Sequence, residues 1–169
     1  EFYKNNLKRE NLANEAVDKE DFLKTLKLEM SFAENDKNAI ARLAQMTGKT
    51  NQFNFNKESL SEAEMQEYMD SGNYVLSCSL KDKYGDYGII GLMLVDVNEN
   101  KAKLRNFLLS CRALGRNVEY EYMNTLDNLL VRESLDLAKI YFTKTDRNLP
   151  AEEFYKELLK KDKWKEKLS

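Results

Sequence analysis

A cysteine and two arginines follow directly on an apolar run in the stretch NFLLSCRALGRNVEYEYM. The apolar run predicts a strand that ends at Cys111, and the helical spacing of apolar residues after Asn117 predicts a helix start. A helix start has backbone N–H groups without intrahelical partners, and it attracts anions such as a pyrophosphate. Gly115 would let the backbone approach such a ligand, and Arg112 and Arg116 would add positive charge. We therefore predict an anion site, although these residues alone are more typical of an ordinary strand-to-helix turn.

Cys111 is the candidate nucleophile of this stretch. Two neighbouring arginines and a helix start favour the thiolate form of a cysteine, which is its reactive form. An acyl thioester lying there could pass its acyl group to the sulfur. The alternative is that Cys111 fills a small gap in the core, the usual environment of a free cysteine. The second cysteine, Cys78, lies between Leu76 and Leu80 in an alternating run and is predicted to be a core residue.

The composition argues against several other kinds of chemistry. The 169 residues include no histidine and only two cysteines, which removes Ser-His and Cys-His pairs and argues against a zinc site or a disulfide framework. No metal is therefore expected, and a reducing cytoplasm is the natural setting. The net charge is −2, from 27 basic and 29 acidic residues that are well mixed, so nucleic acid is not an expected partner. No apolar run approaches the roughly 20 residues of a membrane span.

Two polar loops could contribute to a binding site. Residues 51–56 read NQFNFN, and the amides of Asn51, Gln52 and Asn54 could bind a hydroxylated acyl group or the amides of a pantetheine arm. The alternative for these amides is capping and loop chemistry, which their residue types also favour. Asp86, in the stretch KDKYGDYG, is predicted to lie in a turn, with a role at the site as the alternative.

The remaining pattern predicts one mixed α/β domain that positions these residues. Apolar periodicity predicts, in order, a strand near 28–33, helices over 36–48 and 61–71, three antiparallel strands within 74–111, a helix from 117, a strand over 137–145 and a helix from 150. Ser61 and Glu64 form a capping-box pattern, Gly48 is a natural helix stop, and Pro150 suits a first helical turn. Residues 1–27 are highly charged and predict a solvated helix.

Two motifs resemble those of the GNAT acyltransferases. The spacing Arg-x-x-Gly-x-Asn over residues 112–117 resembles their coenzyme A pyrophosphate loop, although Asn117 stands where Gly or Ala is usual. The stretch NLPAEEFY over 148–155 is similar to a second GNAT motif, and the order of elements also matches. The resemblance implies a mixed, mainly antiparallel sheet with helices on both faces. It implies a coenzyme A site built from Arg112, Leu114, Gly115, Arg116, Asn117 and Asn148. It also places Tyr155 where many GNAT enzymes protonate the leaving thiolate, against the alternative of a packed core tyrosine.

A narrower resemblance joins four stretches, TNQFN, LKDKYGDYGIIG, FLLSCRALGRNVE and RNLPAEEFY. In this order they are similar to the C-terminal domain of the FkbH-like proteins, which carry an upstream phosphatase-like domain of the haloacid dehalogenase superfamily. The resemblance implies that residues 1–27 are the tail of such a domain and that 28–169 form a GNAT-like domain. It further implies that a glyceryl-type unit is loaded onto an acyl carrier protein, as a thioester of phosphopantetheine or coenzyme A.

Two classes of function follow from these expectations. In the first, the chain is an acyl-transfer domain acting on a thioester. In the second, it is a non-catalytic module that docks a carrier protein or substrate and has kept the GNAT-like fold. The gap between two predicted strands discriminates between these classes. One strand ends at Cys111 and the other spans residues 137–145, and a thioester cofactor needs an open, V-shaped gap between them.

Overall fold

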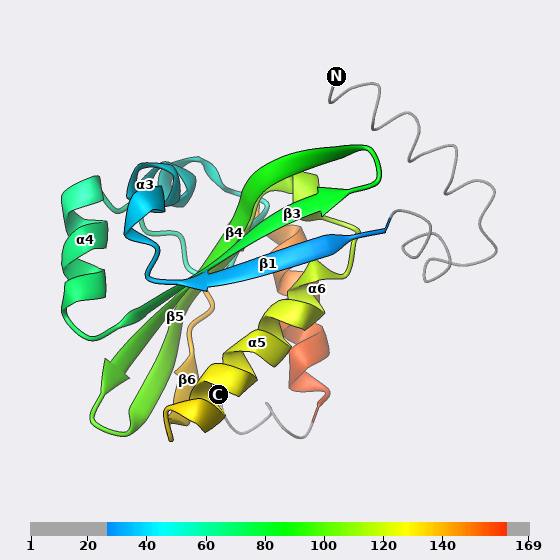
Figure 1. Ribbon diagram of the computed structural model, residues 1–169. Helices are drawn as coiled ribbons and strands as arrows, with labels where there is room; N and C mark the ends of the chain where they lie inside the picture. The colour runs from blue at the N-terminus through cyan, green and yellow to red at the C-terminus, as the bar shows by residue number, and fades with distance from the viewer. Residues whose placement is uncertain (1–26, 162–169) are drawn as a thin grey trace.

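The computed structural model describes residues 27–161, so the helix expected over the first 27 residues lies outside the described part except for Lys27. Its strands are β1 (Glu29–Glu34), β2 (Phe53–Asn54), β3 (Tyr74–Asp82), β4 (Gly85–Asn98), β5 (Lys101–Leu109) and β6 (Asp136–Ile140). Its helices are α3 (Ile40–Lys49), α4 (Glu62–Asp70), α5 (Val118–Arg132) and α6 (Leu149–Leu159), with short 3-10 helices η1 (Lys37–Ala39) and η2 (Cys111–Ala113) (Figure 1). Within the described range, no helix is long and apolar enough to cross a membrane.

The strands form one mixed sheet that is mainly antiparallel. Strands β1, β3, β4 and β5 are neighbours in this order, and each pair is antiparallel. Strand β6 pairs in parallel with the first part of β5. Strand β2 pairs antiparallel with the last two residues of β5, on a register that sets Phe53 opposite Leu109. The predicted fold class, a mixed and mainly antiparallel sheet, is therefore confirmed. Strand β2 is an addition, because its residues were expected to form a loop.

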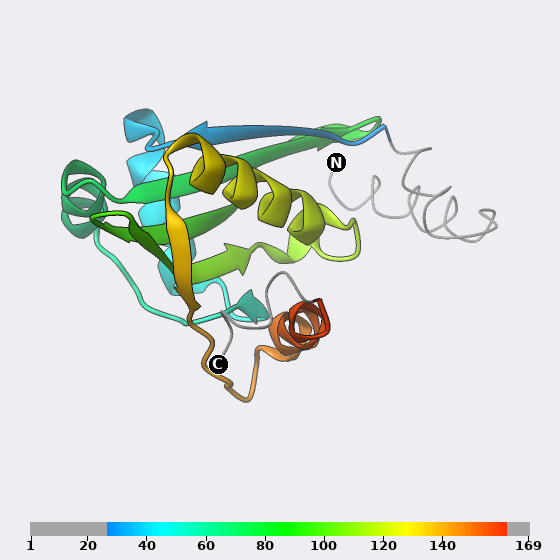
Figure 2. The ribbon, with the colours of Figure 1, turned by 90° about the horizontal axis from the view of Figure 1, so that it is seen from below.

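Helices cover both faces of this sheet (Figure 2). Neighbouring residues of β3 point to opposite faces, so Val75 packs with α3 and α4, whereas Leu76 packs with α5 and α6. The larger cluster, on the α5 and α6 side, also contains Cys78, which is fully buried as predicted. Burial of this thiol raises its pKa to about 12. The alternation along β3 is thus the reason why one strand contributes to two separate cores.

Several local signals act as the sequence predicts. The Ser61 hydroxyl accepts a hydrogen bond from the N–H of Glu64 at 3.1 Å, and the Glu64 carboxylate accepts one from the N–H of Ser61 at 3.0 Å, which completes the capping box. Pro150 lies in the first turn of α6. The β3–β4 turn lies at residues 83–84, before the predicted position, because Asp82 Oδ1 accepts the N–H of Gly85 at 3.1 Å and closes the turn earlier.

The gap between β5 and β6 is filled by residues 53–56. After β6 ends at Ile140, the two strands separate, and the segment 53–56 occupies the space between them. The N–H of Phe55 donates to the carbonyl of Phe107 on β5 at 3.0 Å. The carbonyl of Phe55 accepts from the N–H of Thr143, which follows β6, at 2.7 Å. The open gap that a thioester cofactor needs is therefore closed by the chain's own backbone.

The expectation that residues 51–56 form a loop is wrong for Phe53 and Asn54, which form β2, and holds for the other four residues. The end of β5 presents unpaired backbone groups on its outer edge, and such an edge readily accepts another strand. Phe53 and Phe55 then bury their rings, with 2% and 0% of their surface exposed, against Phe107 and Phe154. The alternation of Phe and Asn in NQFNFN is a two-residue period typical of a strand, although its segment is too short for periodicity to decide.

Candidate functional site

The end of β5 places Cys111 at the surface. The strand ends at Leu109, two residues before the predicted position, and Ser110 begins the 3-10 helix η2. The Ser110 hydroxyl accepts the N–H of Arg112 at 3.2 Å, and the Ser110 N–H donates to the carbonyl of Ile90 at 2.7 Å. Cys111 is exposed, so the alternative interpretation of this residue as a filler of the core is wrong. The turn into η2 rotates the side chain away from the strand's apolar face.

A cavity of about 490 Å³ opens beside Cys111. Its wall comes from α3, from the segment that precedes β2, and from the end of β5 with η2. The lining residues are Arg42, Met46, Lys49, Thr50, Asn51, Gln52, Leu109, Ser110, Cys111 and Arg112. Four of the residues singled out in the sequence, Cys111, Arg112, Asn51 and Gln52, therefore share one cavity. Tertiary structure brings them together from two stretches about sixty residues apart.

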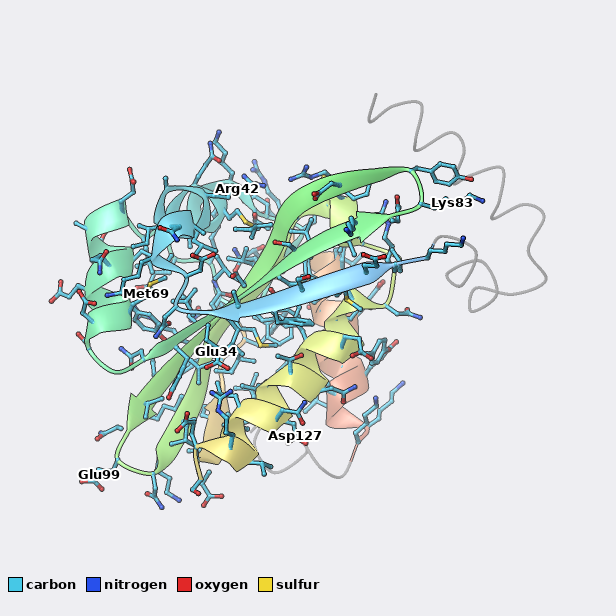
Figure 3. All side chains as sticks on the ribbon, in the orientation of Figure 1. Glu34, Arg42, Met69, Lys83, Glu99 and Asp127 are labelled. Atoms are coloured by element: carbon cyan, nitrogen blue, oxygen red, sulfur yellow. The ribbon has the colours of Figure 1, made fainter. Side chains whose placement is uncertain are left out.

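The electrostatics of this cavity are one-sided. Arg42, Lys49 and Arg112 line it, and no aspartate or glutamate does. Arg42, which extends from α3 (Figure 3), donates a hydrogen bond to the neutral Gln45 side chain at 3.0 Å. Burial, together with the positive charge of Arg112, lowers the pKa of Arg42. The cavity therefore presents a concentration of positive charge next to an exposed thiol.

The predicted phosphate loop lies outside this cavity. Gly115 has a φ of 80° and Asn117 a φ of 59°, so two left-handed residues bend the chain into α5. Residues 112–117 thus form the expected connection at the start of the longest described helix. Arg116 is buried, with 8% of its surface exposed, and its guanidinium lies over the Tyr87 ring at 5.1 Å from the centroid. Its charge is directed into the protein rather than toward the helix start.

A second cavity, of about 280 Å³, opens beside this loop. Leu114, Gly115 and Asn117 line it together with the start of α5 and with α6. It is also lined by three carboxylates and by no lysine or arginine, the carboxylates being Glu119, Glu153 and Glu157. Carboxylates repel a pyrophosphate, whereas the free N–H groups at the start of α5 attract one. The coenzyme A site that the GNAT resemblance implies over residues 112–117 and Asn148 therefore stays a prediction.

Asn148 and Asn54 use their amides within the chain. Asn148 Nδ2 donates to the carbonyl of Asn54 at 3.0 Å and to that of Thr143 at 2.9 Å. Its Oδ1 accepts the N–H of Thr145 at 2.8 Å. Asn54 Nδ2 in turn donates to the carbonyl of Thr50 at 3.0 Å. These bonds attach the inserted segment to the loop before α6.

Tyr155 and Asp86 lie apart from the cavity that contains Cys111. The Tyr155 ring stacks on Phe142 with a centroid distance of 4.4 Å and contacts the edge of Phe55. Partial burial raises the pKa of the Tyr155 hydroxyl. Asp86 lies at the start of β4 rather than in the predicted turn, and it is exposed and accepts the N–H of Gly88 at 2.9 Å. The structure therefore does not bring Tyr155 or Asp86 together with Cys111, and a catalytic role for Tyr155 stays a prediction.

The cavity adds residues that the sequence reasoning missed. Arg42 and Lys49 lie on either side of Met46 on α3, at spacings of four and three residues, which places all three on one helix face. The sequence signal was therefore present as a cation, an apolar residue and a cation at helical spacing. It could not be interpreted without knowing that this face of α3 turns toward the end of β5. Among residues 27–161, no cluster of His, Cys, Asp or Glu could hold a metal ion.

The arrangement of these elements is similar to that of solved N-acetyltransferases. A ribosomal-protein alanine N-acetyltransferase from Escherichia coli aligns with a TM-score of 0.55 and 12% identity, over 77% of this chain and 76% of that chain. An aminoglycoside acetyltransferase from an uncultured soil metagenomic sample aligns with a TM-score of 0.52 and 10% identity, over 77% and 90%. A ribosomal-protein alanine N-acetyltransferase from Brucella melitensis aligns at 0.50 and 8%, over 77% and 89%.

These likenesses establish a GNAT-like acetyltransferase fold, which the sequence motifs also predicted. No protein-family profile matches the sequence, and a comparison with curated proteins finds no match. The FkbH-like resemblance stays a prediction. The same holds for the upstream phosphatase-like domain, of which residues 1–27 would be the tail.

Proposed function

We propose that this GNAT-like domain transfers an acyl group between thioesters, with Cys111 as the nucleophile. The observation that supports the proposal is that Cys111 is exposed on the wall of a cavity that also holds three cations. Arg42, Lys49 and Arg112 favour the negative charge that develops on a thioester oxygen during attack. No histidine is needed for this kind of stabilisation.

The chemistry is a thiol–thioester exchange in two steps. The Cys111 thiolate attacks the thioester carbonyl, a new bond forms between the Cys111 sulfur and the acyl carbon, and the bond from that carbon to the pantetheine sulfur breaks. The pantetheine thiolate leaves and takes up a proton from water. In the second step the thiolate of an acceptor pantetheine attacks the acyl group on Cys111, which restores the free Cys111 thiolate. Acyl group and charge balance at each step.

The thioester we propose is the phosphopantetheine arm of an acyl carrier protein. The filled gap between β5 and β6 and the carboxylates beside Gly115 leave the cavity of Cys111 as the approach for a pantetheine arm. Coenzyme A carries the same arm and is the alternative donor. The glyceryl unit and the upstream phosphatase-like domain rest on the FkbH-like resemblance of the four sequence stretches. This proposal places the protein in the cytoplasm, where biosynthesis on acyl carrier proteins takes place.

Exchange between two carrier proteins tests the proposal. We expect that a carrier loaded with a glyceryl-type unit, assayed both with and without a phosphate on that unit, transfers its acyl group to a second, distinguishable carrier, and that mass spectrometry finds the acyl mass on the peptide containing Cys111. Cys111→Ala and Cys111→Ser should both lose transfer while keeping their circular dichroism spectrum and unfolding midpoint. Because Cys111 is exposed, its replacement should change stability by less than about 0.5 kcal/mol. Transfer at the wild-type rate by Cys111→Ala would refute the role of Cys111 as the nucleophile.

The second candidate function is a docking module without catalysis. The closed gap between β5 and β6 favours it, because residues 53–56 occupy the position that a thioester cofactor requires. In that case the carrier protein binds with equal affinity to the wild type and to Cys111→Ala, and no acyl mass appears on either. Affinity measured by calorimetry alongside the exchange assay therefore separates the two functions.

A further inference from the structure

Three cationic side chains line the cavity beside Cys111. Arg42 and Lys49 come from the same face of α3, and Arg112 comes from η2 on the opposite wall. The floor between them is apolar, because Met46 and Leu109 both line the cavity and are each 1% exposed. The cavity therefore has an apolar floor of limited size, surrounded by cations.

These cations are not neutralised by the described part of the chain. Arg42, Lys49 and Arg112 form no ion pair with any residue of 27–161. Two other arginines, by contrast, have carboxylate partners, since Arg105 pairs with Glu58 and Arg132 with Glu34. The repulsion between Arg42 and Arg112 is large enough to contribute to a lowered pKa of Arg42. A bound anion would relieve that repulsion.

The position of Cys111 indicates which part of a thioester carries the anion. A thioester carbonyl at the Cys111 sulfur places the acyl chain inside the same cavity as the cations. The phosphate of a pantetheine arm lies at the other end of a long chain of covalent bonds, so an extended arm with its sulfur at Cys111 carries its phosphate out of this small cavity. The charge that fits these cations is therefore on the acyl group itself.

We propose that Arg42, Lys49 and Arg112 form a subsite for the negatively charged end of the transferred acyl group, a carboxylate or a phosphate. This inference rests on the proposed acyl transfer and narrows its substrate class. A plain glyceryl group carries no charge, so the unit bound here is one that still bears its phosphate, or one with a second carboxylate. Asn51 and Gln52, on the same wall, can bind hydroxyl groups of a short chain. Carboxylate and phosphate are the anions that arginine recognises best.

The two haloacetyl reagents iodoacetate and iodoacetamide provide a direct test. They differ in charge and little in size, and both alkylate the same thiolate. The ratio of their rate constants therefore cancels any change in how much thiolate is present and reports recognition of the anion. Cys78 is fully buried, so Cys111 is the thiol that reacts in the folded chain. We expect the ratio of iodoacetate to iodoacetamide rates to exceed that of an uncharged cysteine derivative by roughly threefold to tenfold at low salt.

Variants locate the effect. Arg42→Gln combined with Lys49→Gln should lower the ratio toward that of the small thiol, with Arg112 left as the remaining cation, and high salt should lower it in the wild type. Lys101→Gln is the matched control, because Lys101 is an exposed cation at the opposite end of β5 and pairs with Asp136. A wild-type ratio equal to that of the small thiol would overturn the inference. So would an equal fall of the ratio in Lys101→Gln.

Protection of Cys111 from iodoacetamide distinguishes the sources of the anion. Inorganic phosphate and malonate should protect the wild type and should fail to protect the double variant. S-methyl phosphopantetheine, which has no free thiol to consume the reagent, should protect no better than inorganic phosphate at equal concentration, since its arm adds no contact with the cations. Protection by S-methyl phosphopantetheine at concentrations where phosphate and malonate fail would assign the cations to the arm and overturn the acyl-group subsite. These readouts need no acyl transfer, so the subsite can hold even if Cys111→Ala transfers normally and the proposed nucleophile fails.

Discussion

Replacement of Asn148 by alanine should destabilise the protein, although Asn148 was predicted as a cofactor contact. The side chain is 2% exposed and makes three hydrogen bonds, to the carbonyls of Asn54 and Thr143 and from the N–H of Thr145. Each intrachain hydrogen bond contributes about 1 kcal/mol net, and a buried carbonyl left without a donor costs about 1–3 kcal/mol. Partial replacement by water at the edge of the loop offsets some of this. The expected loss is roughly 2–4 kcal/mol.

Urea unfolding measures this loss. With a denaturant slope of about 2 kcal/mol per molar, the midpoint should fall by about 1–2 M. Native-state hydrogen exchange should also speed up at the N–H groups of Thr145 and Thr143, because Thr143 donates to Phe55 on the segment that Asn148 holds. Asn51→Ala is the matched control, since Asn51 lies at the other end of that segment, its side chain accepts a hydrogen bond from the exposed Lys57, and its loss should shift stability by less than about 0.5 kcal/mol.

Asn148→Asp checks the donor role separately. This variant keeps the size of the side chain and an acceptor oxygen but directs a carboxylate at the two carbonyls, so it should be at least as destabilising as alanine near neutral pH. The two carbonyls raise the pKa of this carboxyl in the folded state above the unfolded value of about 4, and its protonation restores one donor. The difference from wild type should therefore shrink as the pH falls from neutral toward about 4 and change no further below it. An Asn148→Ala protein with wild-type stability and unchanged exchange would refute the reasoning and return Asn148 to the role of a ligand contact.

Two further predictions concern the sheet beneath the site. Gly91→Ala should cost about 1–3 kcal/mol in thermal or urea unfolding, because its Cβ would lie 2.5 Å from Leu109 Cδ2 and 3.2 Å from Tyr122 Cε2; unchanged stability would contradict this packing. Stability should also decline as the pH rises above about 9. The folded-state pKa of Cys78 is raised to about 12, so the unfolded chain loses this proton first. Cys78→Ala should flatten that decline relative to wild type, and an identical slope would contradict the assignment.

Much of the scaffold could be predicted from sequence because its signals are local. The alternation through Leu76, Cys78 and Leu80 identifies a half-buried strand wherever it occurs in a fold. Ser61 and Glu64 satisfy each other's backbone groups within one turn, so their pairing needs no distant residue. The order of such elements, with the two GNAT-like motifs, was enough to predict a mixed, mainly antiparallel sheet covered on both faces.

The site itself was decided by contacts between segments far apart in the chain. Cys111 was expected at the end of a strand, but its exposure depends on the turn that Ser110 makes against Ile90 of the neighbouring strand. Arg42 was unremarkable in sequence and became a site residue only because α3 packs beside the end of β5.

The segment 53–56 illustrates the same limit. Its two phenylalanines and intervening asparagine are compatible with a loop or a strand, and local energies do not choose between them. The choice came from the unpaired edge of β5 and from the amide of Asn148, which lies more than ninety residues further along the chain. Sequence by itself determined which elements form and in what order. Tertiary structure decided which backbone fills the gap between β5 and β6 and which side chains surround Cys111, because both depend on burial and hydrogen bonds that exist only once distant segments meet.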